Sequence, residues 1–191
     1  MVALEKVGTY WTWICAHFKN VDLDQIWKAG LENSSLHKVE GLHCSFSRNF
    51  DLTLSQYTCL QSKLKHSLQP MNEEILSSRI FFDPEILFLP SHTENKTFVV
   101  LKLWDMSDTL VKILRKIDEI VEELDLEPYF KGKLFHMSIF TIEEKLENLG
   151  QKKKQAILDL LNPVVKTLDD QELHIENIFL SLGDKLLPIL K

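Results

Sequence analysis

The sequence contains one short pattern twice, in Gly41-Leu-His-Cys-Ser-Phe-Ser-Arg48 and again in Leu134-Phe-His-Met-Ser-Ile-Phe140. In both stretches a histidine is followed two residues later by a serine, and apolar residues alternate with the polar ones. Alternation of this kind predicts a short β-strand with one polar face and one apolar face.

The alternation assigns a face to each side chain of the two predicted strands, because residues i and i+2 of a strand point the same way. In the first strand, we expect one face to carry His43, Ser45 and Ser47 and the other to carry Cys44 and Phe46. In the second strand, we expect one face to carry His136, Ser138 and Phe140 and the other to carry Met137 and Ile139. Each strand would thus present a histidine and a hydroxyl opposite a set of core residues.

Each predicted strand is followed by a segment with helical spacing of its apolar residues, at 54–68 and at 143–161. A His-x-Ser strand followed by an amphipathic helix, occurring twice, is the pattern expected of two similar lobes placed side by side. Two such lobes facing a common cleft would bring two imidazoles and two hydroxyls around one small anion.

The remaining elements complete a mixed fold. Aromatic and β-branched stretches predict further strands at 9–18, 79–89, 97–104 and 173–182. Apolar residues at three- and four-residue spacing predict further helices at 23–31 and 107–125. The second of these helices is expected to be capped by Ser107 or Asp108 and to be terminated by Pro128. Strands and helices mixed in this way predict an α+β fold.

The length and composition are those of an ordinary globular protein. The chain has 191 residues, of which 45% are hydrophobic and 26% are charged, and a chain of this length buries a substantial core. We expect residues 1–191 to form a single domain of two lobes. No apolar run approaches the roughly 20 residues that a membrane span needs, and the first residues do not resemble a signal peptide.

The charge and the cysteines limit what the protein binds. With 22 basic and 28 acidic residues, the net charge is −6, which argues against a protein that neutralises many phosphates of a long nucleic acid. A protein that handles one or two phosphates at a strand end needs no such surface. The three cysteines are too few for a disulfide framework and lack the spacing of a zinc site. We therefore expect a reducing compartment and no cofactor.

Two imidazoles and two hydroxyls suit the cleavage of an RNA phosphodiester. One imidazole removes a proton from the attacking hydroxyl or water, and the other protonates the departing oxygen. Imidazole can do both, because its ordinary pKa of about 6.5 lies near working pH. Serine hydroxyls can donate hydrogen bonds to the non-bridging oxygens, whose charge rises in the transition state. This chemistry requires no metal, and the sequence shows no carboxylate cluster that would bind one.

Several other residues have a functional and a structural interpretation. Trp11 and Trp13 share a strand face and could line a nucleobase pocket, but core packing is the more common role of such a strand. Lys131 and Lys133 precede the second motif and could attract the phosphate backbone, although exposed lysines are usually only solvated. Cys44 lies inside the first motif but on its apolar face, which favours a small core residue over a nucleophile.

The sequence resembles the 2H phosphoesterases, and within them the enzymes that process the 3′ end of U6 small nuclear RNA. The resemblance covers most of the chain. It rests on Trp11-Thr-Trp13, Leu42-His-Cys-Ser-Phe-Ser47, Phe81-Phe82, Glu94-Asn-Lys-Thr-Phe98, Ile117-Asp-Glu-Ile-Val-Glu-Glu-Leu-Asp-Leu126, Tyr129-Phe130, Phe135-His-Met-Ser138, Ile178 and Leu182-Gly-Asp-Lys185. It implies two lobes related by a pseudo-two-fold axis, each with an antiparallel sheet and one His-x-Ser motif.

The resemblance also implies an activity and a set of site residues. The expected enzyme is a metal-independent 3′–5′ exoribonuclease that trims the uridine-rich tail of U6 RNA. It leaves a 2′,3′-cyclic phosphate, which some members then open to a 3′-phosphate. Carried over by motif, His43 and His136 are expected to be catalytic, and Ser45 and Ser138 to bind the phosphate. The implied location is the nucleus, and we expect a monomer with an RNA 3′ end as its partner.

The resemblance departs from the family pattern just before the second motif. Animal members have a tyrosine six residues before the second histidine, where it can stack on a nucleobase; this chain has Phe130 there, with Tyr129 beside it. A phenyl ring can still stack, so Tyr129, Phe130, Lys131 and Lys133 are candidate RNA contacts. Two rival interpretations stay open: another 2H cyclic or 2′–5′ phosphodiesterase, and a non-catalytic RNA-binding protein.

Overall fold

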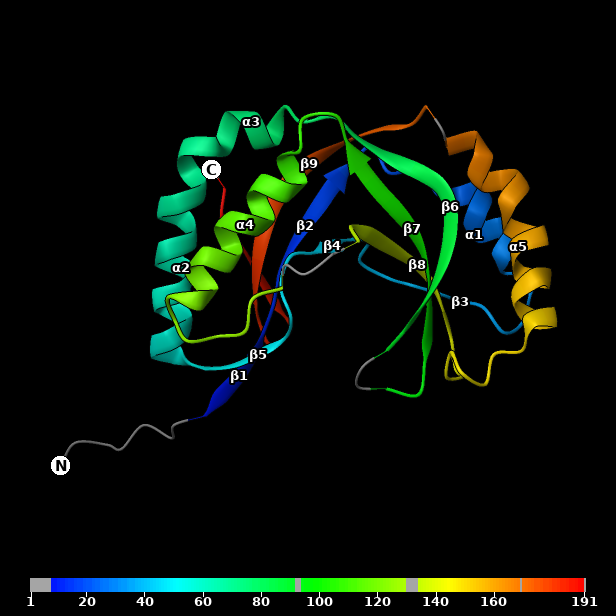
Figure 1. Cartoon of the computed structure of the whole chain (residues 1–191), viewed down its shortest axis with the longest axis horizontal. Coiled ribbons are helices and arrows are strands. Elements are labelled where there is room, and N and C mark those ends of the chain that lie inside the picture. Colours follow the sequence, from blue (N-terminus) through cyan, green and yellow to red (C-terminus); the bar gives the residue numbers. More distant parts are fainter. Residues whose placement is uncertain (1–7, 92–93, 130–133, 169, 191) are drawn as a thin grey trace.

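In the computed structural model, eight strands form one continuous antiparallel sheet (Figure 1). The structure describes residues 8–91, 94–129, 134–168 and 170–190. The main path of the sheet runs β3-β8-β7-β6-β9-β2-β4, and β10 pairs with β9. Its strands are β2 (Ile14–Lys19), β3 (His37–Lys38), β4 (Cys44–Ser45), β6 (Ile80–Pro90), β7 (Thr97–Asp105), β8 (His136–Ile142), β9 (Glu172–Leu182) and β10 (Lys185–Pro188). A separate ribbon pairs β1 (Thr9–Thr12) with β5 (Phe50–Thr53).

The helices gather at the two ends of this sheet. Around β2 and β9 lie three helices, and around β6 and β7 lie two others (Figure 1). The first group is α2 (Leu54–Leu68), α3 (Asn72–Leu76) and α4 (Thr109–Glu122). The second group is α1 (Asp24–Gly30) and α5 (Gln151–Val165), and short 3₁₀ turns follow α2 and α5 at Gln69–Met71 and Lys166–Leu168. The molecule thus has a β4 half and a β8 half, named here after the strands that carry the two motifs.

The two halves are joined through a short stretch of strand pairing. Only Ile80 with Leu173 and Phe81 with Glu172 pair between β6 and β9, whereas β6 and β7 pair along nearly their whole length. One cluster of buried hydrophobic residues nevertheless extends through both halves. The α+β class expected from the sequence is confirmed.

Helix α2 begins and ends where the sequence predicted. The side chain of Thr53 accepts a hydrogen bond from the Gln56 N–H at 3.3 Å, and the Gln56 Oε1 accepts one from the Thr53 N–H at 3.0 Å. This capping box satisfies two N–H groups that the helix leaves without intrahelical partners. Tyr57, Leu60, Leu64 and Leu68 are buried along one face, as their spacing predicted.

Helix α4 is shorter than predicted at both ends. Asp108 does precede the helix, but it adopts a left-handed conformation with a φ of 55° and its side chain makes no capping bond. Instead, the Asp105 carboxylate accepts a hydrogen bond from the Leu110 N–H at 3.1 Å. The helix ends at Glu122, well before Pro128. Three residues after this end, Asp125 takes a second left-handed conformation with a φ of 55°. The predicted capping side chain and the predicted end of the helix at residue 125 were therefore wrong.

Helix α5 also differs from its prediction, because it begins at Gln151 and not near residue 143. Residues 143–150 are turns and bends that bond to the sheet: the Thr97 hydroxyl donates to the Glu144 carbonyl at 2.7 Å. Lys153 reaches back from the helix to the Glu144 carboxylate at 2.7 Å. The structure thus fixes at least one of the three consecutive lysines of this helix in an ion pair within the chain.

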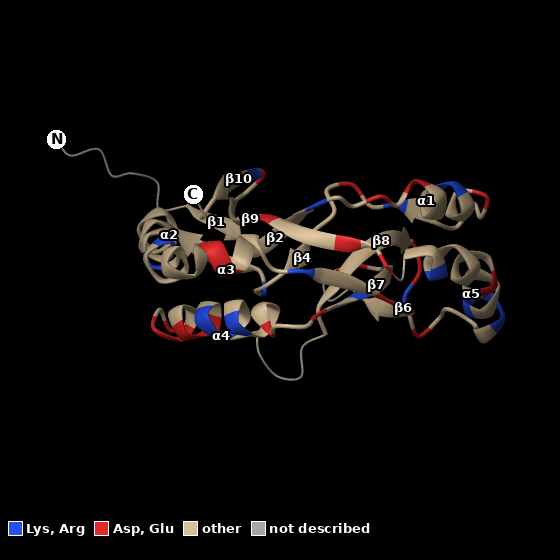
Figure 2. Cartoon of the chain, turned by 90° about the horizontal axis from the view of Figure 1, so that it is seen from above, with Lys and Arg blue, Asp and Glu red and all other residues tan. Residues whose placement is uncertain are grey.

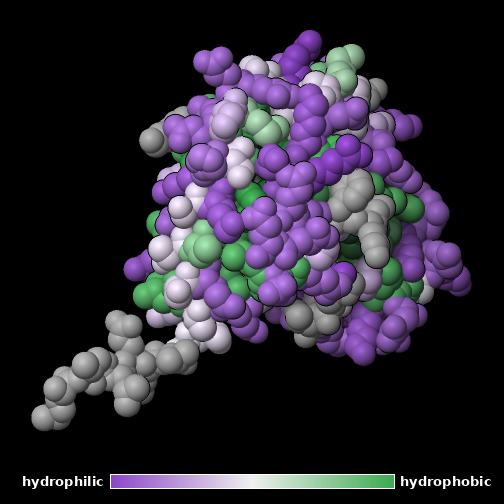
Figure 3. Space-filling model, turned by 60° about the vertical axis from the view of Figure 1, so that its left-hand side comes forward, coloured by the Kyte–Doolittle hydropathy of each residue, from purple (hydrophilic) through white to green (hydrophobic). Residues whose placement is uncertain are grey.

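In Figure 2, Lys and Arg are scattered among Asp and Glu along the helices of the described part of the chain. The face in Figure 3 is mostly hydrophilic, with small hydrophobic patches between the polar residues. No helix in the described part of the chain is long and apolar enough to cross a membrane.

Candidate active site

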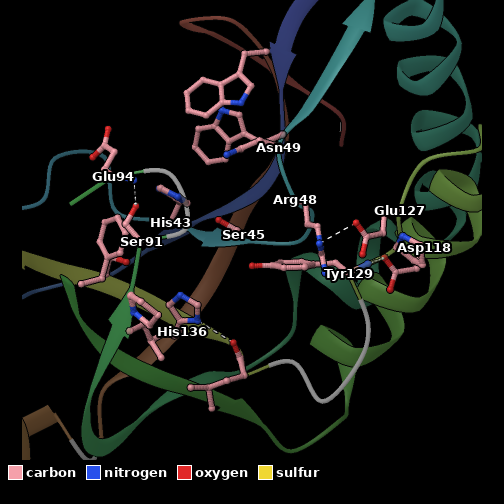
Figure 4. A pocket seen from close by; sticks show the side chains of 18 of the residues that line it. His43, Ser45, Arg48, Asn49, Ser91, Glu94, Asp118, Glu127, Tyr129 and His136 are labelled. Carbon is pink, nitrogen blue, oxygen red and sulfur yellow. Dashed lines mark hydrogen bonds and ion pairs between the residues drawn. The ribbon is translucent and has the colours of Figure 1, made fainter. Parts of the chain in front are cut away.

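A cleft of about 1100 Å³ lies between the two halves and contains both motifs. All four motif residues, His43, Ser45, His136 and Ser138, line it. Figure 4 shows His43 and His136 on opposite sides of this space, one beside the β4 half and one on the strand of the β8 half. The structure therefore brings together two motifs that are far apart in the sequence, as predicted.

His43 lies just before the two-residue strand β4, in a turn that needs a glycine. Its ring Nδ1 is 2.7 Å from the Gly41 carbonyl oxygen, and Gly41 has a φ of +68°, a conformation that glycine adopts without steric cost. The ring also packs against Trp13, with 4.6 Å between centroids, and stacks on His17 at 6.3 Å. His17 belongs to the neighbouring strand β2, and Trp13 is the residue that joins β1 to β2.

His136 is the first residue of the seven-residue strand β8. Its ring Nδ1 is 2.9 Å from the carbonyl oxygen of Leu134, again two residues earlier in the chain. On the β7 side, His136 pairs with Lys102, and β8 also pairs with β3 on its other edge. The second histidine is thus positioned by a strand that lies inside the sheet.

The two rings share one tautomer in their neutral form. A carbonyl oxygen can only accept a hydrogen bond, so Nδ1 must carry the proton in both rings. The remaining nitrogen, Nε2, is then the atom that takes up or gives back a proton. Each of these bonds joins a ring to the backbone two residues before it, so the same local geometry helps to orient both imidazoles.

The serines of the two motifs do not all follow the predicted alternation. Ser45 and Ser138 are partly exposed in the cleft, but Ser47 is 5% exposed and lies elsewhere. Its hydroxyl accepts a hydrogen bond from the Ile14 N–H at 2.8 Å and donates to the Arg48 carbonyl at 2.7 Å. Strand β4 covers only two residues, so the alternation does not extend to Ser47, and its expected position on the cleft face was wrong.

Phe140 was expected on the same face as His136 and Ser138, and this too was wrong. The ring is fully buried against Gly30 of α1, where even a methyl group in place of the glycine hydrogen would be 2.1 Å from it. The pairing of β7 with β8 shifts register between Val99 and Val100. A bulge adds one residue and reverses which face the following side chains occupy.

Tyr129 reaches the cleft from the segment after α4 (Figure 4). Its backbone N–H donates to the Asp118 carboxylate at 2.7 Å, which ties this segment to α4. Partial burial, together with the neighbouring Cys44, raises the pKa of the Tyr129 phenol, so the hydroxyl stays protonated near neutral pH. The other three expected RNA contacts, Phe130, Lys131 and Lys133, lie outside the described residues.

The early tryptophans are not core residues, contrary to the preferred interpretation. Trp11 is 56% exposed, Trp13 is half-buried, and both line the cleft. Thr12 between them is fully buried, so the alternation holds but with its polar residue inside. The two-residue spacing of the tryptophans predicted that they share a face. It could not predict whether that face is exposed, because this depends on the sheet around them.

Charged side chains line the cleft beyond the motifs. Arg48 donates to the Glu127 carboxylate at 2.9 Å, and both side chains are more than half exposed (Figure 4). The described lining also includes Arg115 and the acidic residues Glu94, Asp118, Glu119 and Glu122. Acidic residues thus outnumber basic ones in this part of the lining.

The two cysteines near the cleft are structural. Cys44 is fully buried, as its position on the apolar face predicted. Burial, reinforced by Cys44, raises the pKa of Cys15 to about 12, so its thiolate, the nucleophilic form, is suppressed. The structure shows no disulfide for Cys15, Cys44 or Cys59. Among the described residues, no group of three or more His, Cys, Asp or Glu is placed to hold a metal ion.

The structure is similar to that of Usb1 from Kluyveromyces marxianus, with a TM-score of 0.63 and 13% identity over 96% of this chain and 99% of that one. A structure of the same yeast protein with uridine monophosphate gives a TM-score of 0.59 and 12% identity, over 96% and 98% of the two chains. At this level of identity the likeness shows the fold. It confirms the α+β architecture that the resemblance to the 2H phosphoesterases implied.

Residues 14–189 match the family model HVSL, described as "Uncharacterised conserved protein". This match spans both motifs and nearly the whole chain, so the protein belongs to the HVSL family. No match to the sequence was found among the curated proteins.

Proposed function

We propose that the protein is a metal-independent 3′–5′ exoribonuclease that trims the uridine-rich 3′ end of U6 RNA. The observation that carries this proposal is the pair of histidines facing one cleft, each with Nδ1 held by the carbonyl two residues earlier. A binding protein has no use for two imidazoles oriented in the same tautomer. The fold shared with Usb1, one structure of which holds uridine monophosphate, supports a uridine-containing substrate.

The first step forms a cyclic phosphate. The 2′-oxygen of the penultimate nucleotide attacks the terminal phosphorus while the bond to the departing 5′-oxygen breaks. One of the pair, His43 or His136, accepts the 2′-hydroxyl proton on Nε2, and the other donates a proton to the leaving oxygen. Ser45 and Ser138 donate hydrogen bonds to the non-bridging oxygens as their charge rises.

Opening the cyclic phosphate is the reverse pattern with water in place of the leaving oxygen. The histidine that acted as acid is now unprotonated and takes a proton from water, while its partner returns a proton to the 2′-oxygen. Each turnover of both steps therefore restores both protonation states. Because of this reciprocity, we expect that a group with a single fixed charge cannot replace either histidine.

The proposed substrate suits the charge of the molecule. A net charge of −6 and a partly acidic cleft lining disfavour long nucleic acids held by many phosphates. A 3′ end that inserts one or two phosphates between the histidines avoids this penalty. We propose that the enzyme acts as a monomer, as one domain of two lobes, and in the nucleus, where U6 RNA is the substrate that the resemblance implies.

The test is a cleavage assay on a short RNA that ends in several uridines, with EDTA present and the 3′ ends resolved by mass spectrometry. We expect stepwise shortening with 2′,3′-cyclic or 3′-phosphate ends, and no shortening by the His43→Ala or His136→Ala variant. A 2′–5′-linked oligouridine run in parallel identifies the 2′–5′ phosphodiesterase alternative.

The controls separate the remaining outcomes. His66→Ala changes an exposed histidine of α2 outside the cleft and should cleave like the wild type. RNA left intact by a folded wild-type protein would favour a non-catalytic RNA-binding protein. Cleavage that survives both histidine substitutions would rule out the two-histidine mechanism.

A further inference from the structure

The exposed Trp11 indole is the feature of the cleft that the proposed chemistry leaves without a role. Water contacts more than half of it, although an indole is among the largest apolar surfaces that a side chain can bury. It lies in the cleft that holds both histidines. An aromatic ring left exposed beside a reaction site calls for a ligand with a flat apolar face.

Trp11 and Trp13 form a row that leads away from His43. Trp13, which joins β1 to β2, packs directly against the His43 ring at 4.6 Å, and Trp11, two residues earlier in β1, lines the same cleft. The rise of a strand separates two such side chains by roughly 7 Å. The row therefore begins at the reacting centre and ends at the more exposed side of the cleft.

The row is held rigidly by the end of β9. The Trp11 carbonyl accepts a hydrogen bond from the Gly183 N–H, and the Trp13 carbonyl accepts one from the Ser181 N–H, both at 2.9 Å. The Ser181 hydroxyl also accepts a bond from the Trp13 N–H at 2.8 Å. Because the backbone is already fixed at both tryptophans, a nucleobase that stacks there costs the protein little conformational entropy.

We propose that Trp11 is a stacking platform for the nucleobase one position upstream of the nucleotide that carries the attacking 2′-hydroxyl. This inference rests on the proposed function. The 3′-terminal nucleotide departs, and the rest of the RNA must leave the cleft toward solvent, where Trp11 lies. Trp13, next to His43, is close to the reacting nucleotide, which places Trp11 beside the base that follows it upstream.

If Trp11 is a stacking platform, the enzyme should prefer longer RNA substrates without preferring a particular base at this position. A trinucleotide is the shortest substrate that places a base on Trp11, while a dinucleotide ends before it. Every base offers a π-face, so stacking tolerates any base at this position. The platform also supplies affinity without basic residues, which suits a cleft whose described lining is more acidic than basic.

The experiment compares kcat/KM for UpU and UpUpU, counting removal of the 3′ nucleotide from each. For the wild type, we expect kcat/KM for UpUpU to exceed that for UpU by about 5- to 140-fold, the range that base–aromatic stacking provides. For Trp11→Ala, we expect the two substrates to become nearly equal through a loss on UpUpU alone. Trp11→Phe should retain part of the preference.

Two controls are needed. One separates the effect of the extra base from that of the extra phosphate, and the other compares Trp11 with an aromatic residue of the same strand outside the cleft. A trinucleotide with an abasic 5′ residue keeps the extra phosphate, so it should react like UpU with the wild type. Tyr10→Ala removes an aromatic side chain that is 42% exposed on the same strand but does not line the cleft. That variant should keep the wild-type length preference.

The outcomes also separate this inference from the proposed function. If Trp11→Ala keeps the wild-type preference, or loses equally on both substrates, the platform is overturned while the exonuclease stands. If the wild type cleaves neither RNA, the proposed function fails, and binding of a 2′-deoxyuridine trinucleotide, followed by tryptophan fluorescence, decides the platform. Weaker binding by Trp11→Ala than by Tyr10→Ala would support the platform, and equal binding would refute it.

Discussion

The two histidine motifs have the same local geometry on very different supports. His43 precedes a two-residue strand at the edge of the sheet, and its ring packs against Trp13, which joins β1 to β2, and against His17 of β2. His136 begins a strand that pairs on both edges. What the two motifs share, the bond from Nδ1 to the carbonyl two residues earlier, spans only three residues. The comparison teaches that the orientation of the ring repeats because it depends on a local contact, while the support of each motif depends on its half.

The largest expected effect tests whether the two halves are equal partners in the chemistry. General acid–base groups contribute about 10²–10⁴-fold each, so His43→Ala and His136→Ala should each lower the single-turnover rate by about that amount. Because the two residues act in one proton-transfer cycle, the double variant should be scarcely slower than either single variant. Rate losses that multiply in the double variant, or a rate loss in only one of the single variants, would show that the two histidines are not equal partners. The control variant His66→Ala should cleave at the wild-type rate.

The serines sharpen the same comparison at the phosphate. Ser45→Ala and Ser138→Ala should each lower kcat by about 10²-fold, as loss of one transition-state donor does, with melting temperatures near that of the wild type. Ser47→Ala is the matched control in the same segment. It should keep kcat but lower the free energy of unfolding by about 1–3 kcal/mol, because the buried Ile14 N–H loses its acceptor. A slow Ser47→Ala enzyme would contradict the observed faces.

A smaller effect is expected on stability in the β8 half. Gly30→Ala places a methyl group against the buried Phe140 ring of β8, and overpacking of this kind costs about 1–3 kcal/mol. Urea denaturation should show a lower midpoint for Gly30→Ala than for the wild type. Gly8→Ala adds a methyl group with no neighbour within 4 Å and should be neutral. Equal midpoints for the two variants would mean that α1 shifts away from the sheet without cost.

The smallest effect concerns pH and the β4 half. Burial lowers the pKa of His17 below 6.5, although Glu176 partly opposes this. Below that pH the unfolded chain binds a proton that the folded ring resists, so the free energy of unfolding falls as the medium is acidified. His17→Gln should therefore have a melting temperature that depends less on pH between about 7 and 5. An unchanged slope in His17→Gln would show that burial does not lower the pKa of His17.

The sequence predicted what local pattern controls. Helix α2 appears at its predicted residues because its capping box and apolar face are both written in neighbouring positions. The shared cleft of His43 and His136 was predicted for the same reason, since each His-x-Ser pattern is local and occurs twice. The sequence did not predict that Ser47 and Phe140 would leave the cleft face, because a two-residue strand and a bulge are set by the partner strands.

The tryptophans show a second limit. Their shared face follows from the two-residue spacing, but whether that face would be covered depends on elements that lie far away in the chain. Exposure of Trp11 results from the position of β1 in a two-stranded ribbon beside the cleft. Likewise, Asp105 caps α4 in place of the residues nearest its start, because the loop between them folds back.

The path of the chain through the two halves has a consequence for how the protein unfolds. From β2 the chain crosses to α1, returns for β4, α2 and α3, crosses again for β6 and β7, and returns for α4. It crosses once more for β8 and α5 before it returns for β9 and β10 (Figure 1). Neither half is a continuous piece of sequence, so no single cut releases one of them intact. The segments of each half are connected through the other half. We therefore expect the two halves to unfold together in one cooperative transition. The two histidines would then appear and disappear together, without a half-formed site that binds RNA but cannot cleave it.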